Sequence, residues 1–297
     1  MVRKMPDAAP IKFNKADRNF IGTAVYVSMV PIEPLSGGVC ASRKTAMHIK
    51  HLFLTVLPVI ICGTAPAYGD EFNSAGVRIH YTVTGQGPPV VLVHGLESNA
   101  KINWQLPGTV AQLARDHQVI TFDSRGHGQS DKPQQEGAYG TQMCDDIVRL
   151  LDHLHIQKAQ VVGYSLGGFE VMKLLTMHPE RITSAVMCGA AWLKTGSPLD
   201  RFWANIKGGR GRRGAPPACM RGVSELSVTE SQLKQITPKV ALIVGDRDPC
   251  RAMYIEGAHR LRPDWPVFVV RGAGHFNCIF KPEFKNDLQQ ALSDTIR

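Results

Sequence analysis

The residues best suited to chemistry lie in the run Gly163-Tyr164-Ser165-Leu166-Gly167-Gly168. This run has the pattern G-x-S-x-G, with a strand-like apolar stretch before it and a helix-forming stretch after it. A strand that turns at once into a helix strains its central residue, so the neighbours of that residue must lack bulk. We expect the glycines to give this clearance and Ser165 to project its hydroxyl as a nucleophile. A plain glycine-rich turn is the alternative interpretation.

A serine nucleophile needs a base, because its hydroxyl is poorly reactive at neutral pH. Three histidines follow it: His178, His259 and His275. His178 ends the helix predicted after the serine, and His259 lies in a helical stretch. His275 lies in a glycine-containing loop directly after the last apolar run, where a base can be presented. We therefore predict His275 as the base, with an ordinary surface-loop histidine as the alternative.

The base needs an acid to orient it, and the run Val244–Pro249 offers two aspartates. We predict Asp248 as the acid and expect Asp246 to cap or orient the loop. The preceding apolar run, Ala185–Cys188, is followed by no carboxylate until Asp200. An acid on that strand is therefore not expected.

The elements that must position these side chains are predicted by the hydrophobic pattern. Residues 71–75 and 77–84 alternate as a hairpin does. Continuous apolar runs, typical of strands buried on both faces, lie at 90–93, 119–122, 159–162, 185–188, 240–244 and 267–270. Helix-like stretches lie between or after them, at 141–155, 166–177, after Arg247 and at 282–296. This alternation predicts an α/β fold with a mostly parallel central sheet flanked by helices.

The polar candidates share a position, since each follows an apolar run. In parallel sheets, sites form at the carboxyl ends of the strands. These residues are His94, Asp123, Ser165, Asp246, Asp248 and His275.

Five landmarks in this order resemble the α/β-hydrolase superfamily, in particular its serine hydrolases and carboxylesterases. They are His94-Gly95, 123–130, 163–168, 245–248 and Gly274-His275, and the resemblance runs from about residue 70 to the C-terminus. It implies the α/β-hydrolase fold, with Ser165, Asp248 and His275 as the catalytic residues.

The resemblance implies further features of the site. The backbone N–H groups of Leu96 and Leu166 would form an oxyanion hole, and no cofactor or metal is required. The segment containing Asp123 and His127 would be structural, so neither is predicted to be catalytic.

The family often inserts a helical cap between its sixth and seventh strands, which here corresponds to residues 195–238. The centre of this interval, 207–222, is rich in glycine and proline and carries five positive charges without an acid. We predict a short lid without a stable four-helix cap, and one helix within Ser224–Ile236 that begins near Thr229 or Ser227. A solvated loop is the simpler interpretation. A cationic lid using Arg210, Arg212 and Arg213 to favour anionic substrates is the sharper one.

The expected function is hydrolysis of an ester-like bond in a small or medium acyl substrate, through an acyl-enzyme intermediate. Lactone hydrolysis, carbon–carbon bond hydrolysis and perhydrolysis use the same side chains and remain alternatives. Epoxide hydrolase and dehalogenase chemistry is less favoured, because those relatives need a carboxylate where Ser165 stands. A ligand-binding relative without turnover is the alternative from another class.

The amino-acid composition limits which binding partners and metal sites are expected. The 297 residues are 43% apolar and include seven cysteines without a C-x-x-C pair, which suggests neither a disulfide framework nor a structural zinc site. The net charge is +9, but residues 1–51 alone hold eight Lys/Arg against three acids. The rest is only mildly basic and carries no recognition motif, so a nucleic-acid partner is not expected. A small-molecule substrate is.

The first 67 residues read as separate from the hydrolase domain at 68–297. We interpret residues 1–46 as an unstructured extension, with Met47 as the true start. A real basic tail that precedes an uncleaved anchor is the alternative. Residues 47–67 resemble a signal peptide, with a basic start, an apolar stretch at Leu52–Thr64 and Ala65-Pro66-Ala67 as the cleavage site. This predicts a secreted or periplasmic protein without a stable membrane span in its mature form. If the segment does not act as a signal, a cytoplasmic or membrane-anchored protein is the alternative.

Overall fold

The computed structural model describes residues 69–206 and 215–296. The predictions for residues 1–46 and 47–67, and those for Arg210, Arg212 and Arg213, lie outside these described residues.

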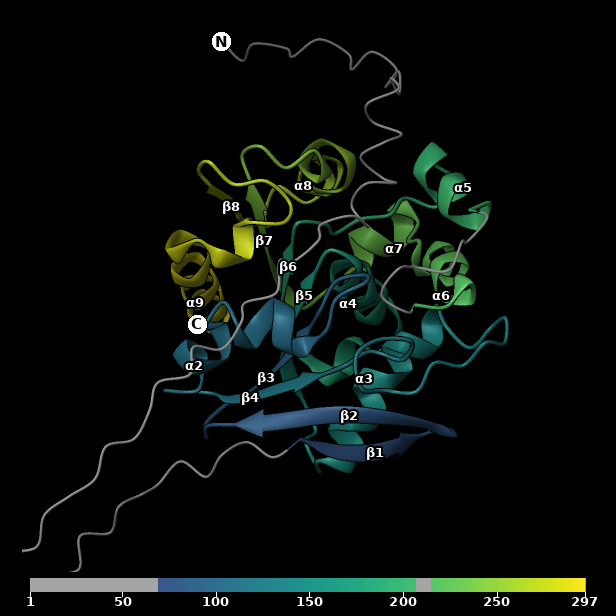
Figure 1. Cartoon of the computed structure of the whole chain (residues 1–297). Helices are drawn as coiled ribbons and strands as arrows, with labels where there is room; N and C mark the ends of the chain where they lie inside the picture. Colours follow the sequence, from purple (N-terminus) through teal and green to yellow (C-terminus); the bar gives the residue numbers. More distant parts are fainter. Residues whose placement is uncertain (1–68, 207–214, 297) are drawn as a thin grey trace, which may run out of the picture. The chain divides into compact units, whose positions relative to one another are not determined.

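The described chain is built on a twisted sheet of eight strands in the order β1-β2-β4-β3-β5-β6-β7-β8 (Figure 1). The pairs β1–β2 and β2–β4 are antiparallel, and all the other pairs are parallel. The fold class predicted from the sequence is confirmed. The strands are β1 (Asp70–Ser74), β2 (Val77–Thr84), β3 (Pro89–Val93), β4 (Gln118–Phe122), β5 (Ala159–Tyr164), β6 (Ile182–Cys188), β7 (Lys239–Gly245) and β8 (Val267–Val270).

Helices cover both faces of the sheet, which explains why the central strands are apolar throughout. In Figure 1, α2 (Thr109–Leu113) and α9 (Pro282–Ile296) lie on one face, and α3 (Thr141–His153) and α4 (Leu166–Met177) on the other. All six residues of β5, between β3 and β6, are buried. The remaining helix on the main body is α8 (Glu256–Leu261), preceded by a π-helical turn, η4 (Arg251–Ile255).

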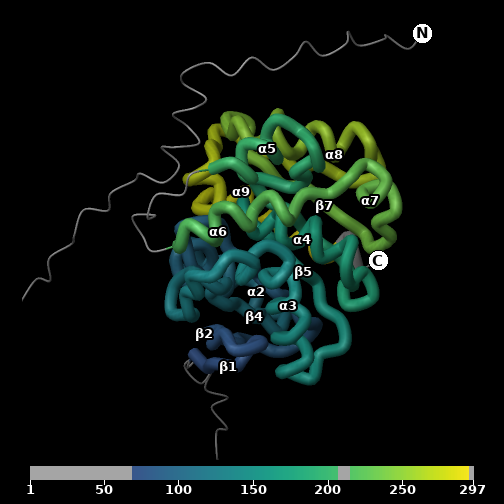
Figure 2. Tube along the Cα trace, turned by 90° about the vertical axis from the view of Figure 1, so that its right-hand side faces the viewer, coloured from purple at the N-terminus to yellow at the C-terminus, as the bar shows by residue number. Residues whose placement is uncertain are grey.

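The connection from β6 to β7 forms the lid, and it is more helical than the sequence predicts. It contains α5 (Pro198–Ala204), α6 (Pro217–Gly222), a 3-10 turn η3 (Val223–Leu226) and α7 (Glu230–Gln235). The one helix predicted within Ser224–Ile236 corresponds to α7, whereas α5 and α6 lie outside that range and were not predicted. Figure 2 shows the lid in green, and its elements η3 and α7 contact α4.

Two features explain the extra helices of the lid. Proline at the first helical position is pre-organised for a helix, and Pro198 and Pro217 stand there in α5 and α6. Both helices also bury apolar side chains, such as Leu199 and Cys219, and they contact each other and η3. The start of α7 agrees with one of the two predicted caps, because Thr229 and Gln232 form a reciprocal capping box.

Within the described ranges, no helix is both long and apolar enough to cross a membrane.

Candidate active site

The carboxyl ends of β5, β7 and β8 bring three predicted side chains together. Ser165 directly follows β5, Asp248 follows β7 and His275 follows β8. His275 Nε2 lies 2.9 Å from Ser165 Oγ, and its Nδ1 lies 2.8 Å from Asp248 Oδ2. Both distances are within hydrogen-bond range, so one imidazole bridges a hydroxyl and a carboxylate.

Ser165 occupies the strained turn that the glycine pattern predicts. Its φ of 56° and ψ of −114° lie outside the conformations that side-chain-bearing residues favour. The turn is tight enough to exclude side chains at three positions. An added Cβ would lie 2.1 Å from Gly167 O at Gly163, 2.4 Å from Val93 O at Gly167, and 2.0 Å from Ala190 O at Gly168.

The loop that carries His275 is hydrogen-bonded to Tyr164, the residue directly before Ser165. The hydroxyl of Tyr164 donates a hydrogen bond to the backbone carbonyl of His275, and the two rings lie 5.7 Å apart. Gly189 gives the imidazole room, because a Cβ there would lie 3.2 Å from His275 Cε1. Tyr164 is a positioning residue that sequence reasoning missed, since it falls at a variable position of the motif.

The two aspartates after β7 do different things. Asp248 is buried, contacts the imidazole and accepts a hydrogen bond from the backbone N–H of Cys250 at 2.9 Å. Asp246 instead accepts from the backbone N–H of Ala273 at 3.1 Å. Backbone N–H groups of the 272–273 loop, that of Gly272 first, lower the pKa of Asp246. Asp246 therefore holds the loop before His275, as predicted, and Asp248 contacts the His275 imidazole.

The loop after β3 lies beside the serine. A Cβ on Gly95 would lie 3.1 Å from Ser165 Cβ, so backbone atoms next to Leu96 approach Ser165 closely. On the other side, Leu166 is the first residue of α4, where N–H groups have no partner within the helix and the helix dipole is positive.

Asn103 fixes this loop, and sequence reasoning missed it. It lies in a π-helical turn, η1 (Lys101–Gln105), and is buried. Its Oδ1 accepts a hydrogen bond from the backbone N–H of Gly95 at 2.8 Å. The five-residue element is too short to leave a periodic signal in the sequence.

The segment after β4 is a brace, as the resemblance implies. The Asp123 carboxylate accepts hydrogen bonds from the backbone N–H groups of Ala100 at 2.9 Å and Gln129 at 2.8 Å. Nearby, burial lowers the pKa of His94 and, with the charge of His94, lowers the pKa of His127 to about 3. Both imidazoles are therefore neutral near pH 7.

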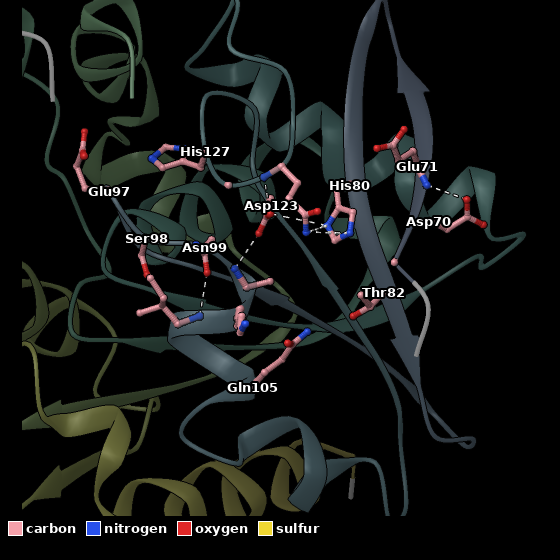
Figure 3. A pocket seen from close by; sticks show the side chains of 16 residues that line it. Asp70, Glu71, His80, Thr82, Glu97, Ser98, Asn99, Gln105, Asp123 and His127 are labelled. Carbon is pink, nitrogen blue, oxygen red and sulfur yellow. Dashed lines mark hydrogen bonds and ion pairs between the residues drawn. The ribbon is translucent and has the colours of Figure 1, made fainter. Parts of the chain in front are cut away.

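A separate polar pocket of about 970 Å³ lies beside this brace (Figure 3). Its lining includes His80 and Thr82 from β2, Ser98 and Asn99 from the loop after β3, and Asp123 and His127. None of the three residues at the imidazole bridge lines it.

The other two candidate bases lie elsewhere. His178 follows the end of α4 and lies 3.4 Å from Asp145, and His259 in α8 contacts the backbone carbonyl of Trp265. Neither contacts Ser165 in the described structure.

A family model described as alpha/beta hydrolase fold matches residues 88–216. An epoxide hydrolase from Vigna radiata superimposes with a TM-score of 0.64 at 16% identity, over 77% of this chain and 98% of that one. A meta-cleavage product hydrolase from Pseudomonas fluorescens superimposes with a TM-score of 0.62 at 23% identity, over 76% of this chain and 98% of that one.

Residues 88–216 thus match the α/β-hydrolase family model, and the described chain has the α/β-hydrolase fold.

Curated relatives in this superfamily include hydrolases of different chemistry. The 2-hydroxymuconate semialdehyde hydrolase of Pseudomonas sp. (strain CF600) is 34% identical over 143 residues, which cover 47% of this chain and 50% of that protein. Bifunctional epoxide hydrolase 2 of Sus scrofa is 30% identical over 163 residues, which cover 53% of this chain and 29% of that protein. The matches thus span half or less of these relatives' own lengths.

Proposed function

We propose that this α/β-hydrolase is a serine hydrolase that cleaves an ester-like bond through an acyl-enzyme intermediate. The observation that carries the proposal is the imidazole of His275, which lies within hydrogen-bond distance of both Ser165 Oγ and Asp248 Oδ2. The family model and the curated relatives support the coarser assignment to hydrolases.

In the proposed mechanism, each side chain has one task. His275 Nε2 accepts the proton of Ser165 as the hydroxyl oxygen attacks the carbonyl carbon. The Asp248 carboxylate accepts a hydrogen bond from Nδ1–H of His275. This bond keeps Nε2 free to act as the base and stabilises the imidazolium that forms. His275 then returns the proton to the leaving group, and water hydrolyses the acyl-enzyme by the same relay.

The oxyanion that forms during attack lies between the loop after β3 and the start of α4. We propose that the backbone N–H groups of Leu96 and Leu166 donate to it. Loss of one such donor typically costs about 3 kcal/mol of transition-state stabilisation. Asn103 contributes indirectly, because it holds the Gly95 backbone beside Ser165.

Hydrolysis of a carbon–carbon bond is the second candidate. It uses the same three side chains, and the similarity to the 2-hydroxymuconate semialdehyde hydrolase favours it. Epoxide opening is less supported despite the structural neighbour, since a serine and not a carboxylate stands at the strained turn.

A fluorophosphonate probe tests the nucleophile. Wild-type protein should be labelled at Ser165, and Ser165→Ala should abolish labelling. Ser98→Ala, in the loop after β3, is the matched control and should be labelled as the wild type is. Labelling that persists in Ser165→Ala would overturn the proposal. Turnover of p-nitrophenyl esters, lactones and a meta-cleavage product then separates the candidate reactions.

We also propose that the protein is exported, with cleavage after Ala67. N-terminal sequencing of protein from the native cell should find Tyr68 first. A start at Met1 or Met47 would contradict cleavage.

A further inference from the structure

A thiol lies behind the proposed acid–base pair. Cys250 begins the turn after β7 and is buried, at 7% exposure. Its backbone N–H donates to Asp248 Oδ1, and its sulfur lies within 4.8 Å of an oxygen of the same carboxylate. The mechanism proposed above gives this thiol no task.

The thiol, the carboxylate and the imidazole form a compact cluster. One ligand atom each from Asp248, Cys250 and His275 lies within 4.8 Å of the other two. Donor atoms of a tetrahedral zinc site, with bonds of about 2.0–2.3 Å, lie roughly 3.3–3.8 Å apart. Side-chain adjustments of about 1 Å therefore suffice to enclose an ion.

The donor types favour one class of metal. Thiolate, imidazole and carboxylate together suit Zn²⁺, whereas Mg²⁺ and Ca²⁺ prefer oxygen ligands alone. Three protein ligands leave the fourth position for water. The His275 side chain is 9% exposed and that of Asp248 is fully buried. A metal ion would therefore reach the cluster from the side of His275.

We infer that Asp248, Cys250 and His275 form an inhibitory site for Zn²⁺ and similar thiophilic divalent metals. The inference rests on the proposed function only for its effect on activity. On binding, the Cys250 thiol releases its proton to solvent and the thiolate binds the metal. His275 Nδ1 becomes a ligand, so its proton moves to Nε2. A protonated Nε2 cannot accept the proton of Ser165, and Asp248 no longer orients the ring.

Zinc inhibition and cobalt spectroscopy of the full chain test this site. With wild-type protein, Zn²⁺ should abolish ester hydrolysis, and EDTA should restore it. Co²⁺ should produce a thiolate-to-cobalt charge-transfer band in the near ultraviolet, a readout that needs no turnover. Cys250→Ala should remove the band and raise the zinc concentration for half-inhibition at least about tenfold, since even an outer partner of a metal ligand is worth that much.

Cys144→Ala is the matched control. Cys144 is also buried, but it lies in α3 and its thiol contacts the backbone carbonyl of Glu170 in α4. This variant should keep both the band and the zinc sensitivity. Should Cys250→Ala fail to fold, Cys250→Ser retains the volume with a weaker ligand and should weaken both readouts.

The outcomes separate this inference from the proposed function. A cobalt band that depends on Cys250 in a protein without hydrolase activity would support the metal site and reject the function. An active enzyme without a band, or with a band unchanged in Cys250→Ala, would overturn the metal site and leave the function standing.

Discussion

The hydroxyl of Tyr164 donates to the backbone carbonyl of His275, a residue 111 positions further along the chain. Tyr164 is also the last residue of β5, next to Ser165. The strand that ends next to Ser165 is therefore also hydrogen-bonded to the loop that carries His275. The relative position of the two groups depends on this one phenol as well as on the sheet.

Tyr164→Phe should make the position of the His275 imidazole less fixed, without removing any of the groups proposed to react. The partly buried carbonyl of His275 loses its donor, which costs about 1 kcal/mol. We expect kcat to fall about tenfold with little change in KM, as steady-state kinetics on an ester would show.

Tyr139→Phe controls for loss of a phenol alone. The Tyr139 hydroxyl donates to the carbonyl of Pro133 at 2.8 Å and contacts none of the three proposed catalytic residues. This variant should lose similar stability in urea unfolding but keep its kcat. Equal kcat values for the two variants would contradict a positioning role for Tyr164.

Substitutions of the two aspartates after β7 should have clearly different effects on activity. Asp248→Asn should lower kcat by about 10⁴, because an amide holds the imidazole in the wrong tautomer. Asp246→Asn should keep most of the activity, since Asp246 binds only the loop backbone. Single-turnover acylation by a p-nitrophenyl ester measures both. A larger loss in Asp246→Asn would reverse the assignment.

Two glycine substitutions should have opposite effects on stability. Gly168→Ala places a methyl group 2.0 Å from Ala190 O and should lower the free energy of unfolding by about 3 kcal/mol or more. Gly257→Ala, in α8, meets only the Trp192 ring at 3.4 Å. It should stabilise the protein by about 0.5–1 kcal/mol through helix propensity. Chemical denaturation tests both, and a neutral Gly168→Ala would contradict the tight turn.

Asn103→Ala should weaken stabilisation of the transition state indirectly, because Asn103 holds the backbone of Gly95. Without its acceptor, the Gly95 backbone can move away from Ser165, so we expect kcat to fall about tenfold while KM changes little. Asn99→Ala is the matched control, because Asn99 Oδ1 accepts from the backbone N–H of Ile102 at 2.9 Å in the same loop. Its loss should lower stability alone. A rise in KM at constant kcat in Asn103→Ala would argue for substrate binding instead.

Glu170 should make stability fall as pH rises. It is fully buried in α4, and in the described part of the chain neither carboxyl oxygen has a hydrogen-bond partner. Burial raises its pKa well above the ordinary value, and the charge of Asp146 adds to the effect. The unfolded chain releases the proton above about pH 4.5, whereas the folded protein keeps it. The contribution of Glu170 is therefore complete at low pH and lost as pH rises.

Glu170→Met tests this linkage. Its stability relative to wild type should increase by about 1.4 kcal/mol per pH unit above pH 4.5, until the folded carboxyl ionises. Urea unfolding at pH 5, 6, 7 and 8 measures the slope. Glu180→Met, at an exposed position, gives the reference pH profile for the same substitution. A pH-independent difference for Glu170→Met would contradict a buried, protonated carboxyl.

The sequence predicted the sheet because its strands are buried on both faces and read as unbroken apolar runs. It also predicted which polar residues meet, since Ser165, Asp248 and His275 each follow such a run and carboxyl ends of parallel strands share an edge. Whether these three are catalytic stays a prediction.

The parts that the sequence did not predict depend on short elements or on distant contacts. Both α2 and η1 are five residues long, too short to show a helical period. In the lid, glycine and proline suggested a loop, yet Pro198 and Pro217 begin helices. The Tyr164 hydroxyl and the Asn103 amide reach backbone atoms of other loops, and no local pattern encodes such a contact.

The unusual conformation at position 165 belongs to the main chain and not to the hydroxyl. The backbone N–H of Ser165 donates to Cys188 O at 2.8 Å, and the carbonyl of Ser165 accepts from the N–H of Gly168 at 2.9 Å. Neither bond involves the side chain. The side chain at position 165 can therefore be exchanged without loss of the backbone hydrogen bonds that hold the turn. A cysteine or an aspartate placed there by protein engineering should retain the same backbone conformation.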